Sequence, residues 1–422
     1  MEKQMKYSGY EWIGEIPEDW DLLDIDNVYI ERNKKVNDTD YMPLSVTMKG
    51  IVPQLDSVVK TEDRSNRKMV CKDDFVINSR SDRRGAYGVS KYDGSCSVIN
   101  IVLKPRNKRN SRFYSYALHS NYFPDEFYRW GSGIVADLWT TRWDSMRKIQ
   151  LPCPPAADRE RIASYLDEKC DCIDEIKKKT IDSIELYKSL KQAVITKAIT
   201  NGIRKNRTVK YSGYSWYGDI PSDWRLLKLK RMFHIKKDIA RREGLTVLSI
   251  TQRGIIPKDI SRNEGQMASD YSNYQLVEQG DFAMNHMDLL TGWVDISHFN
   301  GVTSPDYRVF CLNNSKVTSP EYFLYMLQMC YFNRIFYSLG QGVSEFGRWR
   351  LQADKFLEFD VLVPPYEEQC EIAKYLKQKV SEIDLLVQKK EAYIENLDLL
   401  RKSMIYEYTT GKKEVPAEWV SK

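Results

Sequence analysis

Residues 7–20 read YSGYEWIGEIPEDW, and residues 211–224 read YSGYSWYGDIPSDW, so one chain carries the same tryptophan-rich segment twice. Other landmarks recur in the same order: LSVTMKGIVP returns as LSITQRGIIP, DFVIN returns as DFAMN, and a pair of prolines follows in each half. A period of about half the chain is too long for a solenoid repeat and indicates two copies of a whole module. We therefore predict a tandem internal duplication with a pseudo-two-fold arrangement.

The sequence pattern changes in each module at its pair of prolines. Short runs of β-branched and aromatic residues, broken by Gly, Asn and Asp, precede the prolines and are typical of strands and turns. After the prolines, about 40 residues rich in helix formers contain no internal Gly or Pro, which predicts a long helix. The expected fold class is α+β, with two globular mixed α/β domains built on twisted β-sheets. The expected bounds are 1–155 for the first domain, 156–203 for the central helix, 204–365 for the second domain, 366–412 for the C-terminal helix and 413–422 for a tail.

Apolar residues recur at seven-residue spacing in both predicted helices, as in a coiled coil. The predicted seam consists of Leu166, Ile173, Ile176, Tyr187, Leu190 and Val194 in the first helix and Leu376, Ile383, Leu386, Tyr393, Leu397, Leu400 and Met404 in the second. Each helix could instead pack only against its own domain. A helix of about 40 residues is about 60 Å long and extends beyond a small domain. We therefore expect the two helices to pair with each other as an antiparallel coiled-coil spacer.

The distribution of charge is more informative than the net charge of +5. Residues 60–112 contain fourteen Lys or Arg against six Asp or Glu, and residues 225–262 contain eleven against three. The eight cysteines are scattered and the four histidines lie far from plausible ligand partners, so we expect neither a metal site nor disulfides. No apolar run has the length of a signal peptide or a membrane span, which favours a cytoplasmic protein with no membrane contact.

Two basic domains at a fixed spacing suit double-stranded DNA, because Arg and Lys neutralise phosphates while Arg, Asn and Gln recognise base edges. The candidate DNA-binding residues are Lys49, Asn78, Arg80, Arg83, Arg84 and Arg142 in the first module and Gln252, Arg253, Asn285, His286, Arg348 and Arg350 in the second. For any one of them, a solvated charge or a phosphate contact is an equally simple interpretation. The prediction depends on the recurrence of the same residue types in corresponding segments of both copies.

A search for catalytic motifs favours binding without chemistry. The segment VPPY at residues 363–366 resembles the Asn/Asp-Pro-Pro-Tyr motif of amino methyltransferases, but valine cannot accept a hydrogen bond from a target amine. Its counterpart CPPA lacks the aromatic residue that would stack on a flipped base, and no Gly-rich cofactor loop precedes either segment. There is no P-loop and no recognisable cluster of catalytic residues, so we expect no catalytic site in this chain.

A family resemblance is carried by the doubled tryptophan-rich segment at residues 7–20 and 211–224, here called the entrance segment, and by both ends of the two predicted helices. The helix starts are PPAADRERIASYLDEKCDCIDEI and PPYEEQCEIAKYLKQKVSEID, and the helix ends are VITKAITNG and MIYEYTTGK. Together these segments resemble the specificity subunit of type I restriction-modification enzymes, over essentially the whole chain. One departure is AADRER at the first helix start, where the family usually has a Glu-Gln-like pair, as in YEEQCE.

The resemblance implies two target recognition domains, each of which binds one half of a bipartite, asymmetric site in double-stranded DNA. It implies a chain that is not an enzyme and that binds no cofactor itself. The implied partners are two methylation subunits, which use S-adenosylmethionine to modify adenine, and restriction subunits, which use ATP and Mg to translocate and cut DNA. The alternative left open is a stand-alone DNA- or RNA-binding regulator, which would bind tightly without partner subunits.

The two copies differ most at residues 54–68, 258–274 and 137–147, so we expect the two half-sites to differ in sequence. The entrance segment is too similar in both copies to carry that difference. Its tryptophans could stack on bases, as in proteins that bind single strands. The favoured interpretation is that the segment anchors each domain to its core or to the helices.

Overall fold

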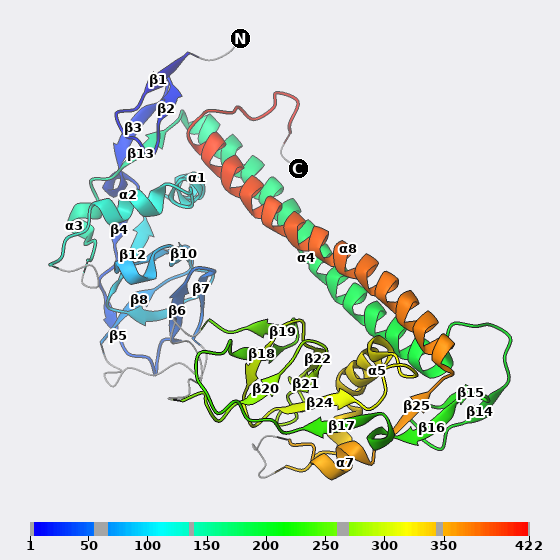
Figure 1. Cartoon of the computed structure of the whole chain (residues 1–422). Helices are drawn as coiled ribbons and strands as arrows, with labels where there is room; N and C mark the ends of the chain where they lie inside the picture. The colour runs from blue at the N-terminus through cyan, green and yellow to red at the C-terminus, as the bar shows by residue number, and fades with distance from the viewer. Residues whose placement is uncertain (1–3, 55–65, 135–138, 260–269, 343–348, 421–422) are drawn as a thin grey trace. The chain divides into compact units, whose positions relative to one another are not determined.

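The computed structural model describes residues 4–54, 66–134, 139–259, 270–342 and 349–420 (Figure 1). The chain divides into two compact units, and each unit combines segments that are far apart in the sequence. Unit 1 comprises Met1–Thr180 and Glu391–Lys422, and unit 2 comprises Ile181–Lys390. Two long helices, α4 (Ala156–Asn201) and α8 (Tyr366–Thr409), therefore contribute residues to both units.

Unit 1 is built on short antiparallel strands. Its main sheet has the order β10-β9-β12-β4, beside a three-stranded sheet of order β11-β8-β5 and the pairs β1-β2, β6-β7 and β13-β3. The strands are β1 (Met5–Tyr7), β2 (Glu15–Pro17), β3 (Asp21–Asp24), β4 (Tyr29–Glu31), β5 (Lys35–Val36), β6 (Leu44–Thr47), β7 (Gly50–Pro53), β8 (Arg67–Val70), β9 (Phe75–Asn78), β10 (Tyr87–Val89), β11 (Gly94–Ser97), β12 (Asn100–Pro105) and β13 (Gln150–Cys153). The short helices are α1 (Lys108–Leu118), α2 (Phe123–Arg129) and α3 (Trp143–Met146).

Unit 2 repeats this topology, which agrees with the predicted duplication. Its main sheet has the order β17-β24-β21-β22, which is the order β4-β12-β9-β10 of unit 1 in equivalent strands. The strands are β14 (Val209–Tyr211), β15 (Asp219–Pro221), β16 (Arg225–Lys228), β17 (Phe233–Lys236), β18 (Leu248–Thr251), β19 (Gly254–Pro257), β20 (Gln275–Val277), β21 (Phe282–Met284), β22 (Val294–Ile296), β23 (Gly301–Thr303), β24 (Arg308–Leu312) and β25 (Asp360–Val363). The short helices are α5 (Pro320–Phe332), α6 (Ile335–Ser338) and α7 (Ala353–Leu357).

Each domain shares its hydrophobic core with the start of the long helix that follows it. In unit 1, Phe75 of the main sheet and Phe113 of α1 are buried in one cluster with Leu166 of α4. In unit 2, Phe282 of the main sheet is buried in one cluster with Leu376 of α8. Buried aromatic side chains supply much of the apolar area that stabilises such a core. Within each unit, residues of one long helix also pair with residues of the other.

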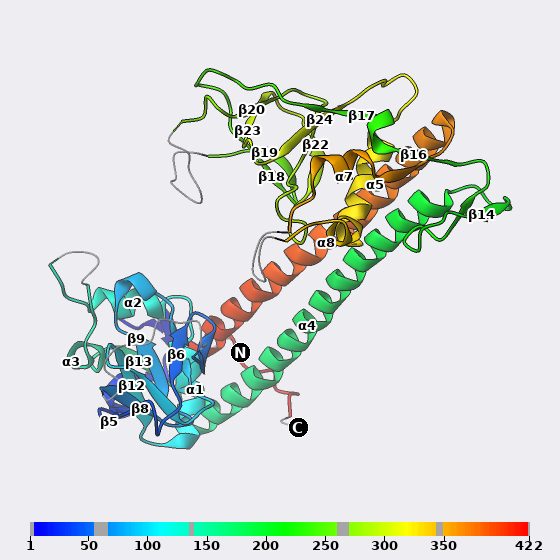
Figure 2. The ribbon, with the colours of Figure 1, turned by 90° about the horizontal axis from the view of Figure 1, so that it is seen from below.

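Within each unit, the start of one long helix runs antiparallel to the end of the other (Figure 2). In unit 1, Lys177 of α4 donates a 2.5 Å hydrogen bond to Asp398, and Arg401 of α8 donates one of 2.7 Å to Asp174. In unit 2, Lys191 of α4 donates hydrogen bonds of 2.8 Å to Asp384 of α8. In these pairs, residue numbers rise along α4 while they fall along α8.

The predicted seam consists of two columns of residues in each helix, each with a spacing of seven. The structure corrects one of these columns. Leu166, Ile173, Leu376, Ile383 and Leu397 are buried and Val194 is half-buried, as expected of seam residues. Ile176 is half-buried like Val194, whereas Leu190, Leu386 and Leu400 are exposed by 48%, 41% and 56%. The second column instead lies one residue further on, and its members are Cys170, Lys177, Ile184 and Lys191 in α4 and Val380, Val387, Ile394 and Arg401 in α8.

The physical reason for this correction is that the true second column contains cations. Lys177, Lys191 and Arg401 occupy it, and each forms an ion pair with an aspartate of the facing helix. Long basic side chains can cover apolar surface with their stems while the charged group meets a partner. A search for apolar residues alone therefore selects the neighbouring column.

The doubled entrance segment anchors each domain to the end of a long helix. Gly411 follows α8 and Gly202 follows α4, and both adopt a φ of +72°, as glycines that terminate helices commonly do. A Cβ at Gly411 would lie 3.1 Å from the ring of Trp20, and one at Gly202 would lie 3.1 Å from the ring of Trp224. Both tryptophans are buried, and so is Trp12 of the same segment. Their rings are therefore not available for stacking on bases.

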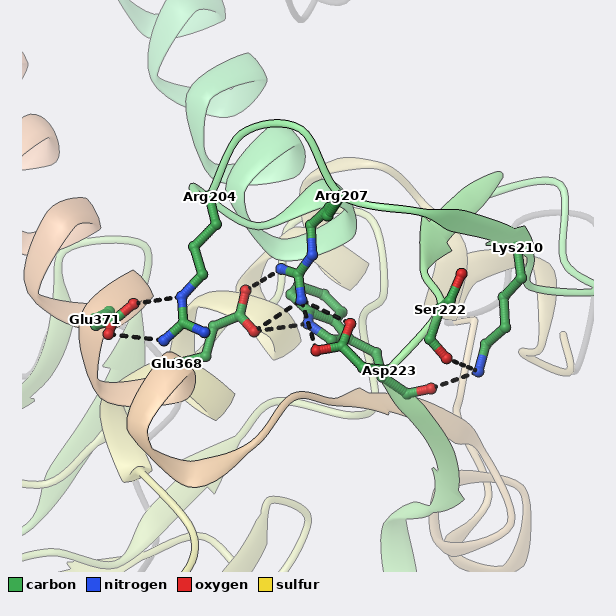
Figure 3. Close-up of polar contacts among 8 residues, drawn as sticks. Arg204, Arg207, Lys210, Ser222, Asp223, Glu368 and Glu371 are labelled. Atoms are coloured by element: carbon green, nitrogen blue, oxygen red, sulfur yellow. Dashed lines mark hydrogen bonds and ion pairs between the residues drawn. The ribbon is translucent and has the colours of Figure 1, made fainter.

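An ion-pair cluster ties the entrance of unit 2 to the start of α8 (Figure 3). Glu368, in the first turn of α8, is fully buried and pairs with Arg207. The indole Nε1 of Trp224 donates a 3.1 Å hydrogen bond to the same carboxylate. Arg207 also pairs with Asp223, and Arg204 pairs with Glu371. Glu368, the first residue of the Glu-Gln pair in YEEQCE, therefore anchors the entrance segment of unit 2 to α8.

Candidate nucleic-acid interface

Two equivalent turns present predicted DNA-binding residues to solvent. Lys49 lies on the turn between β6 and β7, and Gln252 and Arg253 lie on the turn between β18 and β19. In both turns a threonine hydroxyl closes the loop, because Thr47 donates to the carbonyl of Gly50 at 2.9 Å and Thr251 donates to that of Gly254 at 3.0 Å. All three predicted residues are exposed, and Lys49 and Arg253 form no ion pair within the described residues. The same backbone thus carries different side chains in the two modules.

Asn78 and Asn285 have a turn-forming role in the structure. Each ends or follows an equivalent strand, β9 or β21, and each side-chain oxygen accepts a hydrogen bond from a backbone N–H two residues further on. The distance between donor nitrogen and acceptor oxygen is 3.0 Å from Arg80 N to Asn78 Oδ1 and 3.2 Å from Met287 N to Asn285 Oδ1. Asparagine commonly stabilises turns in this way. Direct contact with a base stays a prediction for both residues, and their oxygen atoms are already engaged.

The predicted DNA-binding arginines of the first module differ in whether their guanidinium groups form ion pairs within the described residues. Arg84 pairs with Asp125 and lies over the ring of Tyr128, and Arg83 lies 3.8 Å from Asp82. Arg80 and Arg142 are exposed and form no ion pair within the described residues. The last two therefore offer charges that a phosphate or a base edge could use.

In the second module, Arg350 is exposed and is positioned by paired backbone hydrogen bonds with Gln341, at 2.9 and 3.1 Å. Arg348 lies outside the described residues. His286 is buried, and its Nδ1 has no hydrogen-bond partner within the described residues. Burial, together with the nearby charges of Arg308 and Arg350, lowers the pKa of His286 to about 3, so its imidazole is neutral near pH 7.

One basic residue that the sequence argument missed is Arg308, the first residue of β24. It is 5% exposed, although it stands in a strand of apolar residues. A comparison of the two copies could have found it, because the equivalent position in unit 1 is occupied by Ile101. Pairing in the main sheets gives this equivalence, since Met284 faces Arg308 in unit 2 and Ile77 faces Ile101 in unit 1.

The described residues contain no group of three or more side chains suited to hold a metal ion. All eight cysteines are free thiols in the structure. Among the helices of the described ranges, none has both the length and the apolar character that crossing a bilayer requires.

Comparisons with known proteins agree with the resemblance drawn from the sequence. Residues 221–396 match the family model described as "Type I restriction modification DNA specificity domain". The chain is 24% identical to the type I restriction enzyme MjaVIII specificity subunit of Methanocaldococcus jannaschii, covering 95% of this chain and 94% of the relative. It is 21% identical to the putative MjaX specificity subunit of the same organism, covering 96% of each chain.

A comparison of structures supports the fold. The structure superposes with a TM-score of 0.65 on a solved chain. That chain belongs to a structure described as "Structural basis underlying complex assembly and conformational transition of the type I R-M system". The superposition covers 94% of this chain and 99% of that chain, at 13% sequence identity. The α+β fold class expected from the sequence is therefore confirmed.

Proposed function

We propose that this chain, a member of the family of type I restriction-modification specificity proteins, recognises a bipartite site in double-stranded DNA. Each unit would bind one half-site. The observation that carries the proposal is the duplicated turn, in which Lys49 replaces the Arg253 of the other module on the same backbone. Recognition of two half-sites of different sequence requires different exposed side chains, and the two turns present such side chains on the same backbone.

The chain would act without chemistry of its own. Methylation of adenine with S-adenosylmethionine, and cleavage driven by ATP and Mg, would be performed by partner subunits. The exposed basic residues Arg80, Arg142 and Arg350 would contribute affinity through phosphates or base edges. A protein of this kind would act in the cytoplasm.

The test is to sequence modified adenines in cells with and without this gene. We expect a two-part motif that disappears with the gene, with a fixed number of unspecified base pairs between its halves. Replacing residues 1–150 with the corresponding domain of a relative should change the first half of the motif and leave the second half unchanged. An unchanged first half would contradict the assignment of one half-site to each unit.

Methylation subunits would dock on the long helices, and exposed leucines on those helices support this step. Leu386 and Leu400 of α8 lie two heptads apart on one face of the helix, outside the seam, and Leu190 lies in the equivalent column of α4. Exposed apolar side chains that recur on one face of a helix commonly mark an interface for another protein.

Changing Leu386 to Glu should weaken this docking without unfolding the chain. Because the side chain is exposed, we expect a change in stability within about 0.5 kcal/mol. Because a charge would enter an apolar interface, we expect the affinity for the methylation subunit to fall by at least tenfold, on the order of a hot-spot loss. Titration of labelled methylation subunit measures this affinity. Gln388→Glu introduces the same side chain two residues further on, on another face, and should leave the affinity unchanged. Equal affinities of both variants and the original chain would exclude this docking face.

A further inference from the structure

A cavity of about 330 Å³ in unit 2 is lined by an unusual number of basic groups. Lys237 follows β17, His286 follows β21, Arg308 begins β24 and Arg350 precedes α7, and all four residues line this cavity. Among the described residues that line the cavity, none is an aspartate or a glutamate. The main sheet therefore brings together three cations and an imidazole from four separate segments of the chain.

Arg308 is the most deeply placed of these cations. Its guanidinium donates a 2.9 Å hydrogen bond to the carbonyl of Leu351 and lies 4.9 Å from the centre of the Phe356 ring. It forms no ion pair within the described residues, although its side chain is almost fully buried. Burial lowers its pKa to about 10, so it remains charged near pH 7. A buried charge without a counter-ion is costly unless a ligand supplies the opposite charge.

His286, another residue that lines the cavity, carries a ring nitrogen without a hydrogen-bond partner within the described residues. The residue is 6% exposed, and this nitrogen is its Nδ1. Its carbonyl accepts a 3.0 Å hydrogen bond from the N–H of Leu351, whose own carbonyl accepts from Arg308. The backbone of His286 and the side chain of Arg308 are thus joined through the backbone of Leu351. A neutral imidazole can donate one hydrogen bond to an anion that Arg308 and Arg350 attract.

Unit 1 lacks this group of residues. By the register of the two modules, Ile101 stands at the position of Arg308 and Ser79 at that of His286. Ile101 is buried and apolar, and the hydroxyl of Ser79 is engaged with the carbonyl of Ile99 at 2.5 Å. The fold therefore does not need a cation at this position of the sheet. The basic cavity is a property that the second module has in addition to the shared scaffold.

We propose that the cavity lined by Lys237, His286, Arg308 and Arg350 is a phosphate-binding site that holds a backbone phosphate of DNA bound by unit 2. The inference rests on the proposed function and extends it to the residues that bind the DNA backbone of the second half-site. Arginine recognises phosphate by paired, charge-assisted hydrogen bonds. A phosphate contact would fix the position of the duplex on unit 2, while other side chains would distinguish the bases.

The test compares the original chain with Arg308→Ile, which gives unit 2 the residue that unit 1 has. The full complex with methylation subunits is titrated with duplex DNA carrying the bipartite site at several salt concentrations. We expect an affinity loss of about tenfold and a salt-dependence slope smaller by about 0.9, because one phosphate contact is lost. The melting temperature should be unchanged or higher, since an apolar residue replaces a buried charge. Lys205→Gln, which removes an exposed charge outside the cavity, should leave the affinity close to that of the original chain.

A second arm identifies the source of the phosphate. Neutral methylphosphonates are placed one at a time along the second half-site. One position should weaken binding by the original chain and have no further effect on Arg308→Ile, as expected of two changes that remove one contact. If instead inorganic phosphate protects only the original chain against heat, while both chains bind DNA equally, the ligand is a free phosphate and the DNA assignment is overturned.

Two other outcomes would overturn the inference. Equal affinity and equal salt dependence of Arg308→Ile and the original chain would show that the cavity holds no phosphate of DNA. A changed base preference in the second half-site, without a change in the salt slope, would show a base contact instead. Failure of the original complex to bind any bipartite site would contradict the proposed function itself, so the two failures are distinguishable.

Discussion

Replacing Glu368 with Ala is expected to lower the free energy of unfolding of unit 2 by about 3 kcal/mol. The carboxylate is fully buried at the start of α8, where it pairs with Arg207 and accepts a 3.1 Å hydrogen bond from the indole of Trp224. Its removal leaves the indole N–H without an acceptor and deprives the largely buried Arg207 of one of its two carboxylate partners. Unpaired buried polar groups account for most of the expected loss.

The equivalent position in unit 1 provides a matched control. Asp158 stands 210 residues before Glu368, at the same place after a pair of prolines, and its side chain is one methylene shorter. The Nε1 of Trp20, the counterpart of Trp224, has no hydrogen-bond partner within the described residues. Asp158→Ala should therefore cost less than about 1 kcal/mol, as expected of a half-buried residue that forms no ion pair within the described residues.

Hydrogen exchange measured along the full chain separates the two units, because a single unfolding transition need not report on each of them. Glu368→Ala should speed the exchange of amides in the first turns of α8 and in the strands that begin unit 2. Amides of the first turns of α4 should keep their original rates in that variant. Similar acceleration by Glu368→Ala and Asp158→Ala would show that the anchor has no special role in unit 2.

The duplication and the two long helices could be predicted because both leave periodic signals in the sequence. Repeated landmarks identify equivalent strands whatever their exact bounds, and absence of Gly and Pro over about 40 residues leaves few alternatives to a helix. The buried entrance tryptophans followed from a similar argument. A segment that is the same in both modules cannot carry a difference between them, and Trp20 and Trp224 indeed lie in their cores.

The rest depended on pairings between distant residues, which a single sequence does not show. Lys191 belongs to the helix contact because Asp384 faces it, and Leu190 is exposed although it is the more apolar neighbour. Asn78 stays a predicted base contact by residue type, and the turn that its Oδ1 closes is visible only in the structure. Arg308 was overlooked because a basic residue in a strand of apolar residues gives no periodic signal. Only its equivalence to Ile101 identifies it.

Lengthening both long helices by one heptad is expected to change the spacing between the two half-sites. A second copy of residues 178–184 after Ile184 and a second copy of residues 384–390 after Lys390 keep the heptad pattern of α4 and α8. Seven helical residues add about 10 Å, which corresponds to about three base pairs. If the helices act as the proposed spacer, modification at the original spacing should fall by at least tenfold, with a longer gap preferred. The gap is measured by sequencing modified adenines.

Lengthening α4 alone should have a larger effect. Lys177 and Lys191 lie 14 residues apart on α4, and their partners Asp384 and Asp398 lie 14 residues apart on α8. With seven residues added to one helix, the lysines are separated by a longer span than the aspartates, so the ion pairs of unit 1 and unit 2 cannot both be kept. We expect loss of modification at every spacing. The same seven residues added after Lys422 are the control and should leave the motif unchanged. Full modification of the original site by either helix variant would mean that the helices do not set the spacing, and the half-sites would then have to be positioned by the partner subunits.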